Sequence, residues 1–395
     1  MRPLGISAHT VVSAMGRGKA ATLAALRSRQ GGLRPCDFED VAPDGKIGGY
    51  IGRVEGLEAH SLPEALAGYD CRNNRLADMA LRTDGFAEAV AGAAERHGPE
   101  RVAVILGTST SGVLASEDAY RHRDGAGALP AGFDFERTHD LFSLSRFVRA
   151  ALGLRGPAMV VSTACASSAK TFIDAHQLIA AGACDAAVVG GVDSLCRMTL
   201  YGFSALDLIS ATPCRPCDAA RDGISIGEAA GFALLERAES EIALLGYGAT
   251  SDGYHMSAPH PQGVGAIGAM REALARAGLR PDEIDYVNLH GTGTRANDAV
   301  EDHAVADVFG PGVACSSTKG WSGHTLGSAG IVEAVIAALC IREGLLPGCL
   351  NLTEIDPGFS AGVLAENREQ AVRRVVSNSF GFGGINCSLV LGRPG

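Results

Sequence analysis

The sequence lacks long apolar runs and has few aromatic residues. Its most apolar helical stretch, residues 331–340, is short and is interrupted by Glu333, so no membrane span is expected. The first residues contain no apolar segment of the length that a signal peptide needs, so no secretion signal is expected either. Aromatic residues make up 5% of the chain, whereas glycine occurs 52 times, and this composition favours an α/β protein with many tight turns.

Positive charge is also scarce. The chain has 34 lysines and arginines against 44 acidic residues, a formal net charge of −10. This balance argues against general nucleic-acid binding, because a phosphate-rich partner requires the opposite sign, although it does not exclude a local basic patch. The 11 cysteines are unevenly spaced in a long chain and do not resemble the disulfide framework of a small secreted domain. We therefore expect a cytoplasmic protein with reduced cysteines.

The 395 residues exceed the length of a usual single core, so two domains or one duplicated unit are expected. Continuous apolar runs predict strands that are buried on both faces of a sheet, and the strand–helix order of the first part recurs after Ala238. We therefore predict an α/β fold with two halves, residues 1–238 and 239–395. The main strands are expected at 4–15, 101–107, 185–191, 229–236, 242–249, 285–290 and, as a closing hairpin, 374–391. The helices are expected at 19–27, 74–97, 167–180, 264–277 and 298–308.

Two segments show little periodicity. Residues 36–66 are mixed and turn-rich, and we assign them no regular structure. Residues 108–141 carry glycine and charge and are interpreted as a long surface excursion, which in a compact protein is usually functional or an interface.

Cys165 lies where an apolar run ends and a helix begins. The sequence Thr-Ala-Cys-Ala-Ser-Ser at 163–168 leads directly into the helix expected from Ser167. A thiol beside the first helical turn lies near unpaired N–H groups and the positive end of the helix dipole. Both features lower a thiol pKa and favour a nucleophile. From this local context alone, a small buried structural cysteine remains the alternative.

Three other motif matches do not carry a function. Residues 291–296 fit a dinucleotide fingerprint but lack an early β-α-β position and an acidic residue about 20 positions later. Residues 223–227 fit the G-x-S-x-G elbow but follow a polar turn instead of a core strand. Cys214 and Cys217 form a C-x-x-C pair with no second pair at zinc spacing, so a structural loop is the better interpretation.

Several polar groups could work with Cys165. His290 ends a buried strand, where an α/β protein usually places its chemistry; an ordinary loop histidine is the alternative. Lys319 and His324 lie in a turn of small residues that opens a helix, which indicates close backbone approach. Glu333 lies on that otherwise apolar helix, and since a buried carboxylate needs a partner, Lys319 is expected to pair with it. The glycine-rich turn 381–384 supplies N–H groups that could face an oxyanion.

Together these motifs resemble one family. The groups 163–168 (TACASS), 290–294 (HGTGT), Lys319 with Gly323-His324, and 378–384 (NSFGFGG) occur in this order over nearly the whole chain. In combination they resemble the β-ketoacyl-acyl-carrier-protein synthases, the elongating condensing enzymes of the thiolase-like superfamily. The resemblance implies an α/β, five-layered αβαβα fold with two pseudo-duplicated halves.

The resemblance also implies an acyltransferase mechanism. Cys165 would hold an acyl chain as a thioester, with the backbone N–H groups of Cys165 and Phe382 as the oxyanion hole. His290 and His324 would act on a malonyl thioester, whose loss of CO2 leaves an enolate that N–H donors stabilise. Lys319 and Glu333 match the supporting catalytic positions of the family.

Substrate contacts and partners follow from the same resemblance. Thr292 and Thr294 match phosphopantetheine contacts, Phe382 matches the gate to the acyl pocket, and Phe380 is expected beside the substrate. No metal and no bound cofactor are expected, because 4'-phosphopantetheine arrives on the acyl carrier protein. Arg72 and Arg75 match in spacing a basic pair at the pocket mouth that would dock this acidic carrier; exposed, solvated arginines are the alternative.

Two departures from the family bear on the pathway. Cys217 stands where a bulky aromatic residue is common, and residues 198–203 are unlike those of the housekeeping enzymes. These features favour a synthase of a dedicated aryl-polyene or polyketide-like pathway, and ordinary fatty-acid elongation by a homodimer is the open alternative. The partner would then be a chain-length-factor homologue in a heterodimer, instead of a second copy in a homodimer.

Two other classes are less consistent with these residues. A non-catalytic chain-length factor typically lacks the nucleophile, whereas Cys165, His290 and His324 are all present. A coenzyme A-dependent thiolase would need a late cysteine as a base, and Cys387, which follows the 381–384 turn, does not have matching neighbours.

Overall fold

The strands of the two halves follow the same spatial order in the computed structural model, which describes residues 1–38 and 48–394. In each half, the first two pairings along this order are antiparallel and the next two are parallel. The first half runs β1 (Leu4–Ser13), β9 (Ala229–Glu236), β7 (Ala186–Asp193), β5 (Val102–Gly107) and β6 (Ala158–Val161). The second runs β10 (Ala243–Ser251), β17 (Ile385–Gly392), β16 (Arg374–Gly381), β11 (Tyr286–Asn288) and β12 (Ala314–Ser316). The internal duplication predicted from the strand–helix order is therefore present in the topology.

The two halves meet in one 12-stranded sheet. A short antiparallel pairing of β1 with β10, through Leu4 and Leu244, joins them. The domain boundary expected at 238/239 lies in the loop between β9 and β10. Two short strands belong to the long sheet: β14 (Gly362–Val363) and β2 (Gly16–Arg17). Three more form a small sheet: β3 (Leu33–Pro35), β4 (Tyr50–Gly52) and β8 (Ile226–Gly227). The last two, β13 (Leu345–Leu346) and β15 (Arg368–Glu369), pair with each other.

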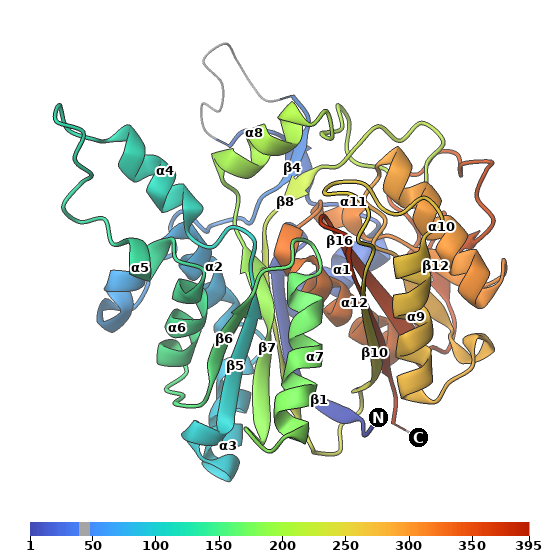
Figure 1. The fold of residues 1–395 in the computed structure, drawn as a ribbon, viewed down its shortest axis with the longest axis horizontal. Helices are drawn as coiled ribbons and strands as arrows, with labels where there is room; N and C mark the ends of the chain where they lie inside the picture. Colours follow the sequence, from blue (N-terminus) through green and yellow to red (C-terminus); the bar gives the residue numbers. More distant parts are fainter. Residues whose placement is uncertain (39–47, 395) are drawn as a thin grey trace.

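Helices cover both faces of each half and share a middle layer (Figure 1). Apolar clusters fill three spaces: outside the first half, between the halves, and outside the second half. This arrangement is the αβαβα layering that the family resemblance implied. The outer helices are α2 (Arg72–Leu81), α3 (Phe86–His97) and α6 (Phe142–Ala151) on one side, and α9 (Val264–Ala277) and α10 (Arg295–Phe309) on the other. The middle helices are α7 (Ser167–Ala180) and α12 (Ala329–Glu343), with α1 (Gly18–Ser28) packed beside α12.

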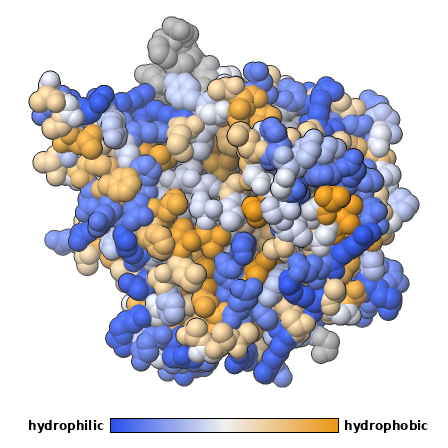
Figure 2. All heavy atoms as spheres, in the orientation of Figure 1, coloured by the Kyte–Doolittle hydropathy of each residue, from blue (hydrophilic) through white to orange (hydrophobic). Residues whose placement is uncertain are grey.

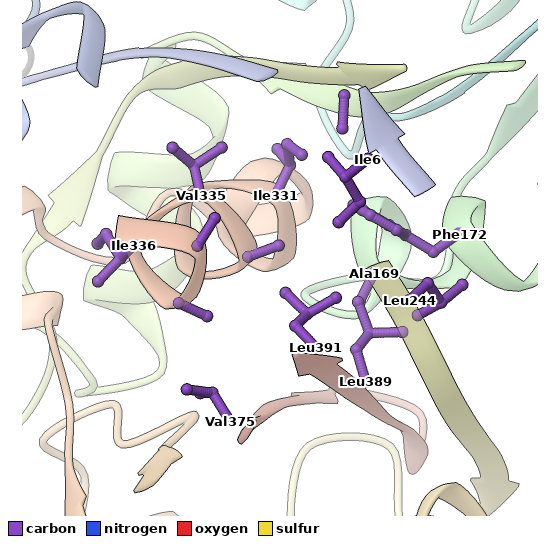
Figure 3. Packing of buried hydrophobic residues seen from close by; sticks show 14 of the residues in the cluster. Ile6, Ala169, Phe172, Leu244, Ile331, Val335, Ile336, Val375, Leu389 and Leu391 are labelled. Atoms are coloured by element: carbon purple, nitrogen blue, oxygen red, sulfur yellow. The ribbon is translucent and has the colours of Figure 1, made fainter. Parts of the chain in front are cut away.

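The middle layer is the deepest part of the core. Figure 3 shows Ile331 and Val335 of α12 and Phe172 of α7 among side chains from strands of both halves. The two helices approach closely, since a Cβ on Gly330 would lie 2.7 Å from the Ala169 nitrogen. Helix α12 is buried from Ala329 to Ile341, which explains why its sequence is apolar all round.

The outer helices and loops depart from the predicted ranges in two places. The single helix expected at 74–97 is wrong: α2 and α3 are separated by a turn in which Asp84 and Gly85 have positive φ. The Asp84 carboxylate turns away to accept the backbone N–H of Lys19 at the start of α1 (3.1 Å). A tertiary contact therefore ends the helix that local periodicity would extend.

The segments without predicted regular structure contain short elements. Residues 108–141 form α4 (Val113–Arg121) and α5 (Phe135–Thr138), which project from the body (Figure 1). Within 36–66, strand β4 and the start of a 3-10 helix are present, and residues 39–47 of this segment lie outside the described residues.

The remaining helical elements are short: α8 (Arg197–Ala205), α11 (Lys319–Ser322), and the 3-10 turns η1 (Glu64–Tyr69), η2 (Pro99–Arg101), η3 (Pro281–Glu283) and η4 (Leu326–Ser328). None of the helices in the described residues has the length and apolar character required to cross a membrane.

Candidate active site

The motifs singled out in the sequence meet where parallel strands end. Strands β11, β12 and β16 are parallel neighbours, so their carboxyl ends lie at one edge of the sheet. His290 follows β11, Lys319 and His324 follow β12, and Phe382 follows β16. Cys165 comes from the first half, in the loop between β6 and α7. The duplicated architecture thus brings residues of both halves to one place.

Cys165 lies on a tight turn that the backbone at Gly381 approaches closely. Ala164, just before it, has φ 48°, in the left-handed region. A Cβ on Gly381 would lie 2.9 Å from the Thr163 carbonyl oxygen and 3.3 Å from the Cys165 nitrogen. Only glycine lets the turn after β16 come this near. As a result, the backbone N–H of Phe382 hydrogen-bonds to the Cys165 sulfur.

Both predicted histidines lie beside the thiol. His324 Nε2 is 3.0 Å from Cys165 Sγ. The His290 ring meets the His324 ring edge to face, with centroids 5.3 Å apart and planes at 83°. One ligand-type atom of each of the three side chains lies within 4.8 Å of the others. All three residues are at most 7% exposed, so the cluster is shielded from bulk water.

Lys319 and Glu333 form a buried pair behind the histidines. The Lys319 ammonium contacts the Glu333 carboxylate, as expected from the sequence, and it donates to the His290 carbonyl oxygen. Its nitrogen also lies 3.4 Å from His290 Nδ1. Both side chains are almost fully buried. An unpaired charge here would cost several kcal/mol of stability. Removing either side chain would therefore destabilise the fold, and the pair keeps the Lys319 ammonium in contact with the His290 carbonyl oxygen.

Burial determines the protonation states of the cluster. Desolvation, the positive charge of Lys319 and the neighbouring His324 hold the pKa of His290 well below its usual range. Desolvation and Lys319 do the same to the pKa of His324. Both imidazoles are therefore neutral at physiological pH, and each carries one N–H donor and one acceptor nitrogen.

The expectation that Cys165 has a lowered pKa is wrong for this state. Desolvation raises the pKa of the Cys165 thiol to about 11, although Lys319 and the N–H of Phe382 act in the opposite direction. The start of a helix does not by itself compensate for removing a thiolate from water. Cys165 therefore rests as a thiol, and His324 Nε2 is the side-chain nitrogen within hydrogen-bond reach of its sulfur.

Sequence analysis missed two carboxylates that accept backbone N–H groups of residues 290–294, which we call the histidine loop. Glu301 of α10 accepts the backbone N–H groups of His290 (2.8 Å) and Gly291 (2.7 Å), and Asn378 of β16 donates to the same carboxylate (3.2 Å). Asp298, one turn earlier, accepts the N–H of Gly293 (3.2 Å). The available signal was the i, i+3 spacing of two acidic residues on a helix that follows a glycine-rich loop.

A cavity of about 310 Å³ leads to the cluster. Its lining includes the four substrate-side positions expected from the resemblance: Thr292, Thr294, Phe380 and Phe382. The two threonine hydroxyls lie 2.9 Å apart. These positions therefore face the space through which a substrate would reach Cys165.

The two arginines expected at the cavity mouth are engaged within the chain. The Arg72 side chain is nearly buried and forms ion pairs with Glu228 (2.6 Å) and Glu58 (2.8 Å). Arg75 pairs with Asp70 at 2.5 Å. Neither arginine lines the cavity. This geometry favours a structural role for Arg72, and carrier docking by the pair stays a prediction that no contact here tests.

The three motif matches to which no function was assigned, at 291–296, 223–227 and 214–217, have structural roles or contain free thiols. Gly291 and Gly293 have positive φ and let the histidine loop pass close to Ser317 and Gly223. Ser225 of the G-x-S-x-G match is fully buried, and its carbonyl oxygen accepts the His324 backbone N–H (2.7 Å). Cys214 and Cys217 are free thiols.

Comparisons with known proteins agree with this geometry. The family model described as "Beta-ketoacyl synthase, N-terminal domain" matches residues 11–241, and that described as "Beta-ketoacyl synthase, C-terminal domain" matches residues 242–353. The chain is 38% identical over 318 residues to the 3-oxoacyl-[acyl-carrier-protein] synthase 2 of Rhizobium meliloti, a match that covers 73% of each chain. It is 40% identical over 261 residues to the mitochondrial 3-oxoacyl-[acyl-carrier-protein] synthase of Arabidopsis thaliana, which covers 60% of this chain and 57% of that protein.

Solved structures resemble the whole chain. One is a ketosynthase (ApeO) in complex with its chain length factor (ApeC) from Xenorhabdus doucetiae, with 39% identity, a TM-score of 0.90, and coverage of 100% of this chain and 98% of that chain. Another is the ishigamide ketosynthase/chain length factor, with 28% identity, a TM-score of 0.89 and full coverage of both chains.

The neutral histidines predict acid sensitivity of folding. His290 and His324 stay unprotonated when folded but take up protons once unfolded, so the unfolded chain binds more protons below about pH 6.5. In that range the free energy of unfolding should fall by about 1.4 kcal/mol per pH unit for each histidine. Urea midpoints at pH 7.5 and 5.5 would measure the fall.

Matched variants separate this effect from general acid sensitivity. His290→Asn should lose distinctly less stability between the two pH values than the wild type, whereas the exposed His122→Asn should lose as much as the wild type. Equal losses in His290→Asn and the wild type would show that His290 is not held neutral.

Proposed function

The chain belongs to the β-ketoacyl synthase family, and we propose that it elongates acyl chains through a thioester on Cys165. It is a condensing acyltransferase of the 3-oxoacyl-[acyl-carrier-protein] synthase type. One observation carries the assignment of residues: the Cys165 sulfur is 3.0 Å from His324 Nε2 and accepts the Phe382 N–H at the inner end of a cavity.

The first step is acyl transfer to Cys165. His324 Nε2 takes the thiol proton as the sulfur attacks the carbonyl carbon of the incoming thioester, because no other base is in hydrogen-bond contact with the sulfur among the described residues. The oxygen of the tetrahedral intermediate becomes negative and is stabilised by the N–H groups of Cys165 and Phe382. The carrier's thiolate leaves, takes up the proton from His324, and the acyl chain remains on Cys165.

The second step is decarboxylation and carbon–carbon bond formation. The malonyl thioester replaces the first carrier arm. Neutral His290 and neutral His324, the latter now in the tautomer with its proton on Nε2, donate N–H groups to the thioester oxygen. Loss of CO2 leaves an enolate whose charge these donors stabilise. Its α-carbon attacks the acyl carbonyl, and Cys165 leaves as a thiolate that is then protonated. Lys319, held by Glu333, fixes the position of His290 throughout.

The cavity suits the arm of a carrier protein. Thr292 and Thr294 present hydroxyls along its wall, and Phe380 and Phe382 supply apolar surface near the sulfur. The proposed substrates are therefore acyl and malonyl groups on an acyl carrier protein. The 4'-phosphopantetheine enters with that protein, so the proposed mechanism uses side chains and backbone N–H groups of this chain and needs no bound cofactor.

A second chain is expected at the end of the long sheet. Strand β6 ends the sheet path, and its residue Met159 is 39% exposed. The projecting segment around α4 and α5 adds exposed Tyr120, Phe135 and Phe142, and Figure 2 shows apolar side chains on this projection. An accessible sheet edge beside exposed apolar residues is suited to pairing with another polypeptide.

The proposed partner is a chain-length-factor homologue. The ketosynthase from Xenorhabdus doucetiae, similar over this whole chain, was determined with its chain length factor. The unusual Cys217 and the residues 198–203 also support a dedicated aryl-polyene or polyketide-like pathway over fatty-acid elongation. A cytoplasmic location completes the proposal, because all 11 cysteines lie in the described residues and are free thiols, as a reducing compartment requires.

Intact-protein mass spectrometry tests the role of Cys165. Incubation with acyl-carrier protein should add one acyl group to the wild type and none to Cys165→Ala, and malonyl-carrier protein should then discharge the adduct as a β-ketoacyl product. Cys71→Ala, which alters another buried free cysteine, should acylate as the wild type does. An adduct of equal yield on Cys165→Ala would refute the assignment.

A product profile tests the pathway. With purified carrier protein and malonyl donor, the chain alone should form little product, and a chain-length-factor homologue should raise the yield at least tenfold and form a stable complex by sedimentation. If the chain alone sediments as a homodimer and makes only saturated fatty-acid-length products with the full set of reductive enzymes, the specialised pathway is wrong.

A further inference from the structure

The three side chains around the nucleophile also form a set of metal ligands. One sulfur or ring nitrogen from each of Cys165, His290 and His324 lies within 4.8 Å of the other two. His290 directs Nδ1 toward the Lys319 ammonium at 3.4 Å, which leaves Nε2 as its ligand atom. His324 already presents Nε2 to the sulfur at 3.0 Å. The donor atoms therefore converge before any ion is present.

Thiolate and imidazole are the preferred ligands of Zn²⁺. Zn–S bonds are about 2.3 Å and Zn–N bonds about 2.0–2.1 Å long. In a tetrahedral site these lengths separate sulfur from nitrogen by about 3.6 Å. The Cys165 and His324 atoms would need to move apart by roughly half an ångström, and any pair of donor atoms near the 4.8 Å limit would need to approach by about 1 Å.

The fourth position of such a site would face the cavity. Cys165, His290 and His324 all line the cavity of about 310 Å³, so a water molecule can complete a tetrahedral set of three protein ligands. The carboxylates of Asp207 and Asp252 line the same cavity and favour the entry of a cation. The Lys319 charge opposes binding, but its contact with Glu333 reduces this repulsion.

We infer that Cys165, His290 and His324 bind one Zn²⁺ ion in the resting enzyme and that this ion inhibits it. Binding exchanges the thiol proton for the metal: the S–H bond breaks, an S–Zn bond forms, and the proton passes to solvent. No oxidation state changes. The bound ion removes both the nucleophile and the N–H donors from the reaction. An acylated Cys165 has no thiolate to offer, so acyl enzyme does not form this site.

The inhibitory effect rests on the proposed function, whereas metal binding needs only the three side chains. Binding is measured directly by titrating the chelator-treated full chain with Zn²⁺, and with Co²⁺ as a coloured substitute whose thiolate charge-transfer band reports an S–Co bond. One ion per chain is expected, with parallel loss of condensing activity and recovery on adding a chelator.

Two variants and one modified form make the test specific. Cys165→Ser should weaken Zn²⁺ binding by more than the roughly 10–100-fold that loss of an outer-shell contact costs, and should abolish the Co²⁺ band. Cys36→Ser, which changes a partly exposed cysteine outside the site, should retain wild-type binding and inhibition. Wild-type enzyme acylated beforehand should also lose the band, which excludes misfolding of the variant as the cause.

The outcomes separate this inference from the proposed function. Unchanged Zn²⁺ affinity in Cys165→Ser, or an active wild type that Zn²⁺ neither binds nor inhibits, would overturn the zinc site alone. A Cys165-dependent Co²⁺ band in a chain that forms no acyl adduct would leave the metal site standing and refute the condensing role.

Discussion

The buried contact between Lys319 and Glu333 is the constraint on which the site depends. Helix α12 is buried from Ala329 to Ile341, so the Glu333 carboxylate within this stretch can exist there only with a partner. Lys319 is that partner, and it also binds the His290 carbonyl oxygen. Removing either charge would leave the other unpaired in the core. The contact therefore links helix α12 of the middle layer to the position of His290.

The same burial determines the chemistry. It keeps His290 and His324 neutral, which is the form that can donate an N–H to a developing enolate and also accept a proton from sulfur. It also keeps Cys165 a thiol at rest, so in the proposed mechanism proton transfer to His324 during attack, and not a lowered pKa, activates the sulfur.

Sequence reasoning predicted the parts whose signals are local. The ranges of α7, α9 and β9 were predicted to the residue, since each is a periodic or continuous apolar run with clear ends. The cluster at Cys165 required the family resemblance, because no spacing in the sequence brings residues from two halves together. Glu301 was missed because it accepts backbone N–H groups of the preceding loop, and Asn378 was missed because its partner is the Glu301 carboxylate, far away in sequence. The end of helix α2 before Asp84 was not predicted for a similar reason, since it depends on a hydrogen bond between Asp84 and the start of helix α1.

The central claim is that Cys165 carries the acyl chain while the neutral histidines promote loss of CO2, and His290→Ala separates the two. His324 is the side chain among the described residues that is hydrogen-bonded to the sulfur, so the account predicts that the His290→Ala variant still acylates Cys165 at near wild-type yield. Release of labelled CO2 from malonyl-carrier protein should fall about 100- to 1000-fold, as for the loss of one oxyanion donor. Wild-type CO2 release, or loss of acylation as complete as the loss of CO2 release in a folded variant, would contradict it.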